Sequence, residues 1–290
     1  ANTTGSNNTA VGSDSLTANT TGIQNIGIGS SALGANTTGA SNVAVGLNAL
    51  DANTTASGNV AVGTSSLGAT TTGHSNTALG NNALAANTTA SYNTAVGNTS
   101  LDANTEGSQN TAVGHGSLTA STTGDYNTAV GSNSLMANTT ADNNTAVGYA
   151  ALDANTGAGA DNTAVGASAL GANTTASYNA AVGTRSLQSN TTGANNTALG
   201  NDSGQANTTG TENTAVGAGS FYYNTTGSSN VAIGRLALFN NTTAADNTAV
   251  GDSALKANTT GASNVAIGAN ALDANTTGST LTAVGAGALG

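Results

Sequence analysis

Histidine and carboxylate side chains are the residues of this chain that are best suited to catalysis or metal binding. His74 and His115 are its two histidines, and they occupy different positions of a repeated sequence unit. Asp51, Asp102 and Asp153 share one unit position but recur in every third unit, roughly 14 Å apart at about 4.8 Å per stacked strand, too far to share a calcium ion. No base stands in register with the plentiful Ser and Thr. We therefore predict no catalytic, cofactor or metal site.

Tyrosine and asparagine residues offer the chemistry of recognition and modification. Tyr92, Tyr126 and Tyr178 share a variable turn position, where exposed rings either grip a glycan or partner or reflect variation at a tolerant turn. Many asparagines begin N-x-T sequons, the acceptor motif for glycosylation, and we expect them to face solvent. The alternative is a turn-forming Asn followed by strand-forming Thr. The candidate glycan acceptors are Asn2, Asn19, Asn36, Asn53, Asn87, Asn138, Asn173, Asn190, Asn207, Asn224, Asn241, Asn258 and Asn275.

A seventeen-residue unit, close to A-N-T-T-G-x-x-N-T-A-V-G-x-x-A-L-x, positions all of these residues. The glycine that closes the A-V-G triplet recurs every 17 residues, except between Gly148 and Gly166, where the step is 18. A fixed period of this size is typical of a solenoid. We predict a single repeat array over residues 1–290, with 17 units, one inserted residue and neither a linker nor a cap.

Composition excludes several classes of function. Lys and Arg number 3 against 13 Asp and Glu, and the net charge of −10 repels nucleic acid and anionic membrane surfaces. No apolar run approaches the roughly 20 residues of a membrane span. The absence of cysteine suits an exposed protein.

Each unit is predicted to form one coil of an all-β, parallel β-solenoid with two short strands. The composition disfavours helix because Gly, Thr and Asn are poor helix formers in helix interiors. The first strand lies around residues 8–11 and the second around residues 15–21, with turns at the glycines. In the second strand Leu16, Ala18 and Thr20 share one face, and the position of Thr17 faces solvent because it varies freely.

The middle residue of the first strand is small in every unit. Its two neighbours, at the positions of Thr9 and Val11, are mostly β-branched, so neither side of the strand suits bulk water. A uniformly small stripe allows close approach, and we predict that it packs against a neighbouring copy of the chain. In the first eight units the stripe is Ala10, Gly27, Ala44, Ala61, Ala78, Ala95, Ala112 and Ala129.

An asparagine precedes the first strand in nearly every unit. Amides stacked at one position, about 4.8 Å apart, can hydrogen-bond along the array. A polar ligand groove is the functional alternative. The predicted ladder begins with Asn8, Asn25, Asn42, Asn59, Asn76, Asn93, Asn110 and Asn127.

The strand and its turn, as in residues 42–49 (N-V-A-V-G-L-N-A) and 264–271 (N-V-A-I-G-A-N-A), resemble the head repeat of YadA-like trimeric autotransporter adhesins. The resemblance implies a left-handed parallel β-roll, three chains packed side by side, and display on the bacterial surface for adhesion. Related repeats occur in phage tail fibres. The A-N-T-T segment lengthens the unit relative to the family's, and no binding residue of the family has a counterpart here.

The expected function is that of an extracellular structural or adhesive fibre segment, a surface adhesin shaft or matrix filament. Its expected partners are copies of itself, as a homotrimer or longer filament, and a glycan or protein of a host surface or matrix. One alternative is an ice-binding β-solenoid, although the Thr3-Thr4 doublet sends its side chains to opposite faces. The other is a phage tail-fibre shaft.

Overall fold

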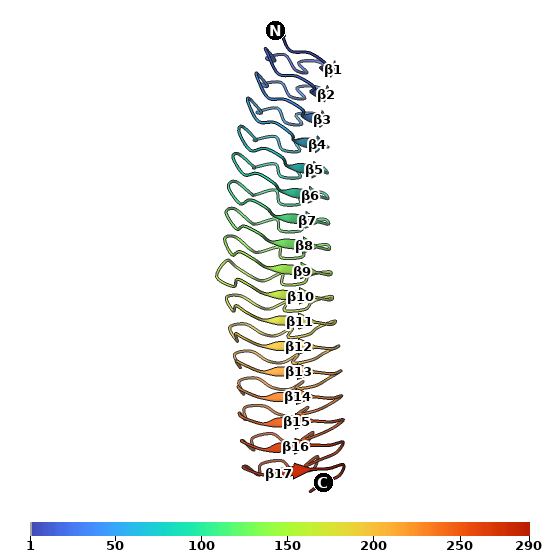
Figure 1. Cartoon of the computed structure of the whole chain (residues 1–290), viewed down its shortest axis with the longest axis vertical. Coiled ribbons are helices and arrows are strands. Elements are labelled where there is room, and N and C mark those ends of the chain that lie inside the picture. The colour runs from blue at the N-terminus through green and yellow to red at the C-terminus, as the bar shows by residue number, and fades with distance from the viewer. Residues whose placement is uncertain (1) are drawn as a thin grey trace. The chain divides into compact units, whose positions relative to one another are not determined.

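A computed structural model describes residues 2–290, and their regular secondary structure consists of short β-strands. The chain divides into two units, Ala1–Asn144 and Thr145–Gly290, which are described separately. In each unit the strands stack in parallel and follow one another in chain order, one coil to a strand (Figure 1). The prediction of an all-β parallel solenoid is confirmed.

Every strand is three residues long and falls on the predicted first strand of its coil. The first unit contains β1 (Thr9–Val11), β2 (Ile26–Ile28), β3 (Val43–Val45), β4 (Val60–Val62), β5 (Thr77–Leu79), β6 (Thr94–Val96), β7 (Thr111–Val113) and β8 (Thr128–Val130). The second contains β9 (Thr145–Val147), β10 (Thr163–Val165), β11 (Ala180–Val182), β12 (Thr197–Leu199), β13 (Thr214–Val216), β14 (Val231–Ile233), β15 (Thr248–Val250), β16 (Val265–Ile267) and β17 (Thr282–Val284).

The strand register follows the sequence repeat. Ala44 of β3 lies beside Ala61 of β4, 17 residues later, and neighbouring strands repeat this alignment. Between β9 and β10 the aligned residues are 18 apart, so the inserted residue leaves the register intact. The insertion lies in a turn, because Asn155 Nδ2 donates to the carbonyl of Gly159 four residues on, where the usual partner is three residues on.

The predicted second strand is not formed, and each coil has one strand instead of two. Residues 13–18 make consecutive turns, with Asp14 at φ 58° and Leu16 at φ 52°, both in the left-handed region. Alternating left-handed residues bend the chain back toward its own strand, which an extended segment cannot do. Hydrogen bonds between coils continue all the same, for example from Leu16 N to Ala32 O at 3.1 Å.

The glycine of the A-V-G triplet is required by both conformation and space. Gly46 has φ 142°, and a Cβ added there would lie 2.5 Å from the carbonyl oxygen of Gly63 in the next coil. A side chain would therefore push the coils apart. The same contact recurs at this glycine in nearly every coil that has a following coil, which explains the glycine at this position of the repeat.

Leucines form the apolar column of the interior. Leu33 and Leu50 are fully buried, as are most of their counterparts. The column is interrupted in two adjacent coils by Gly204 and the buried Phe221. A Cβ at Gly204 would lie 3.0 Å from Leu187 Cδ2, so neighbouring side chains use the space that a leucine would fill. A small residue next to a large one keeps the interior filled.

Candidate functional site

The alanine stripe lies inside the coil of its own chain. Ala44 and Ala95 are 0% exposed in the isolated chain, and a Cβ added at Gly27 would meet Ser15 Oγ and Leu16 Cγ of the interior. A coil this narrow has room for little more than a methyl group beside the leucine column. The prediction that the stripe contacts a neighbouring molecule is therefore wrong for Gly27, Ala44, Ala61, Ala78, Ala95, Ala112 and Ala129, whereas Ala10, in the outermost coil, is exposed.

The opposite side of each strand is the one that faces outward. We call this surface the strand face; it consists of the first and third residues of every strand. Val62 is 37% exposed and Leu79 is 41% exposed, and no described strand carries a charged residue. Each unit thus presents two parallel columns of Val, Ile, Leu, Thr and Ala. Partly exposed apolar residues in a regular, uncharged array are typical of an interaction surface.

The asparagines before the strands form the predicted ladder, here called the strand ladder. Asn25 N donates to Asn8 Oδ1 at 2.9 Å, and Asn25 Nδ2 donates to the carbonyl of Gly39 at 2.7 Å. Asn42 N then donates to Asn25 Oδ1 at 3.0 Å. The backbone bond recurs through Asn59, Asn76, Asn93, Asn110 and Asn127. Burial of these amides costs little because each has partners in the adjacent coils.

The sequon asparagines form a second buried column, here called the turn ladder. Asn36 Nδ2 donates to Asn19 Oδ1 at 2.8 Å and to the carbonyl of Gly39 at 3.1 Å. The nitrogen that a glycan would occupy is thus buried and hydrogen-bonded in the folded coil. The prediction of solvent-facing acceptors is wrong for Asn19, Asn36, Asn53, Asn87, Asn138, Asn173, Asn190, Asn207, Asn224, Asn241 and Asn258, which are at most 1% exposed. Asn2 is exposed and Asn275 half-buried, in the outermost coils.

The turn ladder is interrupted where a shorter side chain replaces asparagine. Thr70 follows Asn53 in the column, and Ser121 follows Asn104. Asn53 Oδ1, Asn104 Oδ1 and Ser121 Oγ are buried without a hydrogen-bond partner. Threonine and serine lack the amide N–H₂ that reaches back to the preceding coil. These interruptions are weak points of the interior.

The three candidate tyrosines and the two histidines lie on the surface. Tyr92, Tyr126 and Tyr178 are each more than half exposed, at turn residues with positive φ. They do not converge on one another. His74 packs edge-on against Tyr92, with ring centroids 5.0 Å apart, and His115 is exposed elsewhere.

Three aspartates share the coil position of Thr17, which the sequence predicted to face solvent. In the structure they are half-buried. Burial raises the pKa of the Asp51, Asp102 and Asp153 carboxyls above the ordinary value, against a smaller opposing effect of backbone hydrogen bonds. Over residues 2–290, no three His, Asp or Glu side chains gather as a metal ion would require.

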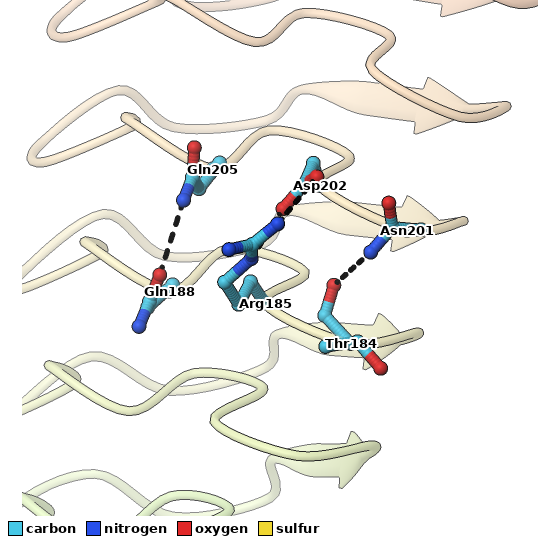
Figure 2. A network of polar contacts seen from close by, with 6 residues as sticks. All are labelled: Thr184, Arg185, Gln188, Asn201, Asp202 and Gln205. Carbon is cyan, nitrogen blue, oxygen red and sulfur yellow. Dashed lines mark hydrogen bonds and ion pairs between the residues drawn. The ribbon is translucent and has the colours of Figure 1, made fainter.

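A polar network lies on the coils around β11 and β12. Arg185 Nε and Nη2 donate to the two carboxylate oxygens of Asp202 at 2.7 and 2.9 Å. Beside this pair, Gln205 Nε2 donates to Gln188 Oε1 at 3.1 Å (Figure 2). In both pairs the partners occupy the same position of successive coils. Because the coils stack in register, side chains at one position of successive coils lie next to one another and form a row on the surface.

Comparison with known proteins gives no family model that matches the chain and no curated protein that matches it. In the described part of the chain, no helix has the length and apolar character needed to cross a membrane. The strand face, the two asparagine ladders and the surface rows are thus the features from which a function must be argued.

Proposed function

We propose that this chain is a non-enzymatic segment of an extracellular adhesive or structural fibre, in which copies of the chain pack side by side through the strand face. The observation that carries the proposal is the pair of uncharged, partly exposed columns along the strands of each unit. A single chain leaves the Val, Ile and Leu side chains of these columns in partial contact with water. A second and a third copy would cover them.

The strand face suits a copy of the same chain for two reasons. Burial of this face removes no charged group from water, so the free energy gained by burying apolar area is not offset by a cost of desolvating charge. Its coils also recur at one spacing, so within each unit two copies match in register. Identical chains usually close such contacts by symmetry. The resemblance to YadA-like head repeats favours a homotrimer, and the fibre's outer surface would then contact a host or matrix component.

The oligomeric state tests this proposal. The native chain is expected to have the mass of a trimer or a larger multiple by native mass spectrometry and sedimentation. Val45→Lys with Val113→Lys places charges on the strand face and should yield single chains. The matched control is Thr38→Lys with Thr89→Lys, at exposed positions outside the strands, which should not change the mass. A native chain that stays single at all concentrations would refute the proposal.

Ice binding is the second candidate, and the strand face also favours it. The Thr-Thr doublet does not form a flat array, because Thr20 turns its hydroxyl to the carbonyl of Thr37 whereas Thr21 is exposed. The strand residues Thr94 and Val96, by contrast, share one outward side with their counterparts in adjacent coils. A thermal hysteresis assay separates the candidates. Activity that disappears in the strand-face lysine variant would make ice the ligand, and inactivity of the native chain would remove this candidate.

A further inference from the structure

The position that follows the leucine column carries large side chains in several successive coils of the second unit. We call it the post-leucine row: Asp153, Gly171, Gln188, Gln205, Tyr222 and Phe239, of which the last four are large. Elsewhere this position holds mainly small or acidic residues. Four of the eight aromatic residues of the chain, six Tyr and two Phe, fall within residues 221–239. This local concentration in an aromatic-poor chain marks a site distinct from the repeat.

The aromatic end of the row is a cluster of three rings, in which Tyr223 is exposed and Tyr222 and Phe239 are half-buried. Tyr222 and Phe239 are stacked, with centroids 5.2 Å apart and an interplanar angle of 28°. Tyr223 stands edge-on to both, with centroids 4.7 Å from Tyr222 and 5.1 Å from Phe239. Tyr223 is 48% exposed. The rings are therefore ordered by mutual contact and still accessible, which limits the entropy lost when a ligand stacks on them.

The other end of the row opens into a hollow of about 540 Å³, lined by Asp153, Ser168, Gly171, Ala172, Gln188 and Ser189. Gly171 and Ala172 keep the hollow open because they lack long side chains. Asp153 and Gln188 supply a carboxylate and an amide. Gln188, which lines the hollow, also accepts a hydrogen bond from Gln205, so the hollow adjoins the polar part of the row. Figure 2 shows the two glutamines.

The charge around the row is nearly balanced. Arg185 is held by both carboxylate oxygens of Asp202, so its charge is compensated within the protein. The carboxylate of Asp153 is the charged group of the hollow. Lys256 carries a positive charge in the coil after Phe239, so between Asp153 and Lys256 the row offers planar hydrogen-bonding groups and ring faces that carry no charge.

We propose that the post-leucine row binds a neutral oligosaccharide, which lies along the stacked coils. The apolar C–H face of a sugar ring would stack on Tyr222, Phe239 and Tyr223. Hydroxyl groups of the following sugar units would bond to Gln205, Gln188 and Asp153, each of which can engage two neighbouring hydroxyls. From Asp153 to Phe239 the row crosses five coil steps, about 24 Å at roughly 4.8 Å each, which accommodates several sugar units. None of these residues belongs to a strand.

Binding of defined oligosaccharides to the full chain tests this proposal. Hexamers of β-1,4-glucose, α-1,4-glucose, N-acetylglucosamine and mannose are titrated by calorimetry, with an oligogalacturonate as the acidic comparison. At least one neutral hexamer should bind, and Tyr222→Ala should weaken it about tenfold or more, as truncation of a central contact residue does. Ala85 occupies the equivalent position naturally, so this variant should fold, which its thermal melting curve will verify.

Tyr126→Ala is the matched control, since it removes an exposed tyrosine outside the row; its affinity should equal that of the native chain. Gln188→Ala with Gln205→Ala should also weaken binding. Failure of all neutral hexamers to bind at millimolar concentration would overturn the proposal. So would equal affinities in Tyr222→Ala and the native chain, or preference for the acidic oligomer. The readout does not depend on the packing of strand faces, because the strand-face lysine variant should retain binding.

Discussion

The interruption of the turn ladder at Ser121 gives a sharp test of how asparagines hold the coils together. Asn104 Oδ1 and Ser121 Oγ are both buried without a partner. In an uninterrupted step, Asn104 Nδ2 donates to Asn87 Oδ1 at 3.1 Å and to the carbonyl of Gly107 at 2.9 Å. Ser121→Asn should reproduce this pair of bonds with the preceding coil and its own turn. The substitution therefore stabilises the chain although it adds a buried polar side chain.

The size of the effect follows from the two unpartnered atoms. A buried polar group without a hydrogen bond costs about 1–3 kcal/mol. Ordering a longer side chain costs up to about 1 kcal/mol in return. For two such atoms and the ordering cost, the net gain from Ser121→Asn is at least about 1 kcal/mol in the free energy of local opening. At about 1.4 kcal/mol per factor of ten, this slows exchange of the neighbouring amides about fivefold or more.

Native-state hydrogen exchange is the suitable assay, because a repeat array opens locally and not as one cooperative unit. The reporters are the amides of Leu118 and Thr122, which donate to carbonyls of the next coil. Ser132→Asn is the matched control at a half-exposed turn, where Asn98 stands in an equivalent position. It should leave exchange within about 0.5 kcal/mol of the native chain. Equal protection in the Ser121 and Ser132 variants would refute the ladder's role.

Thr70 provides a graded comparison within the same ladder. Its hydroxyl already accepts a hydrogen bond from Asn87 Nδ2 at 3.3 Å and donates to the Asn87 carbonyl at 3.1 Å. One atom, Asn53 Oδ1, is left without a partner at this interruption. Thr70→Asn should therefore stabilise its coil less than Ser121→Asn does. The reverse order would contradict the hydrogen-bond explanation.

Three further predictions concern the glycine column, a half-buried carboxylate and the filled interior. Gly46→Ala should cost about 2 kcal/mol or more in hydrogen-exchange free energy, because its φ of 142° and the nearby carbonyl exclude a Cβ. Burial raises the pKa of the Asp102 carboxyl, so the ionised carboxylate destabilises the folded chain. This destabilisation is complete above the folded-state pKa and disappears as pH falls below the unfolded-state pKa. Asp102→Asn should therefore raise the melting temperature at pH 7 but not at pH 3. Gly204→Leu and Phe221→Leu should each destabilise their coils by about 1 kcal/mol or more, whereas the double variant should melt close to the native chain.

The repeat made much of the fold predictable. The period places one strand in each coil, and the strands lie where β-branched residues alternate with alanine. The strand ladder was predictable for the same reason, since residues 17 apart in a solenoid become neighbours. The leucine column was expected to be buried on one side of a strand and is buried, although Leu16 itself has a left-handed φ of 52°. No local signal announces that conformation, because an L-x-A-x-T pattern fits a strand equally well.

The side of the strand that faces inward was not predictable from polarity. Both sides of Thr94-Ala95-Val96 lack charge, and the larger β-branched residues suggested a core. The narrow coil reverses this expectation, because alanine fits beside the leucines and the larger residues do not. The sequon asparagines were misplaced for a related reason. A buried amide is unfavourable in a single coil and favourable once the adjacent coils supply its partners.

The absence of cysteine from the chain allows a direct test of which strand side is enclosed. Single variants Ala95→Cys and Thr89→Cys are labelled with a thiol reagent, in the native chain and in the single-chain strand-face lysine variant. Ala95 lies in the interior and Thr89 at an exposed turn. Ala95→Cys should stay unreactive in both backgrounds while Thr89→Cys reacts fully. In denaturant the two variants should be labelled at the same rate. Rapid labelling of Ala95→Cys in a single chain that melts like its parent would show that the alanines face outward and would contradict the enclosed coil.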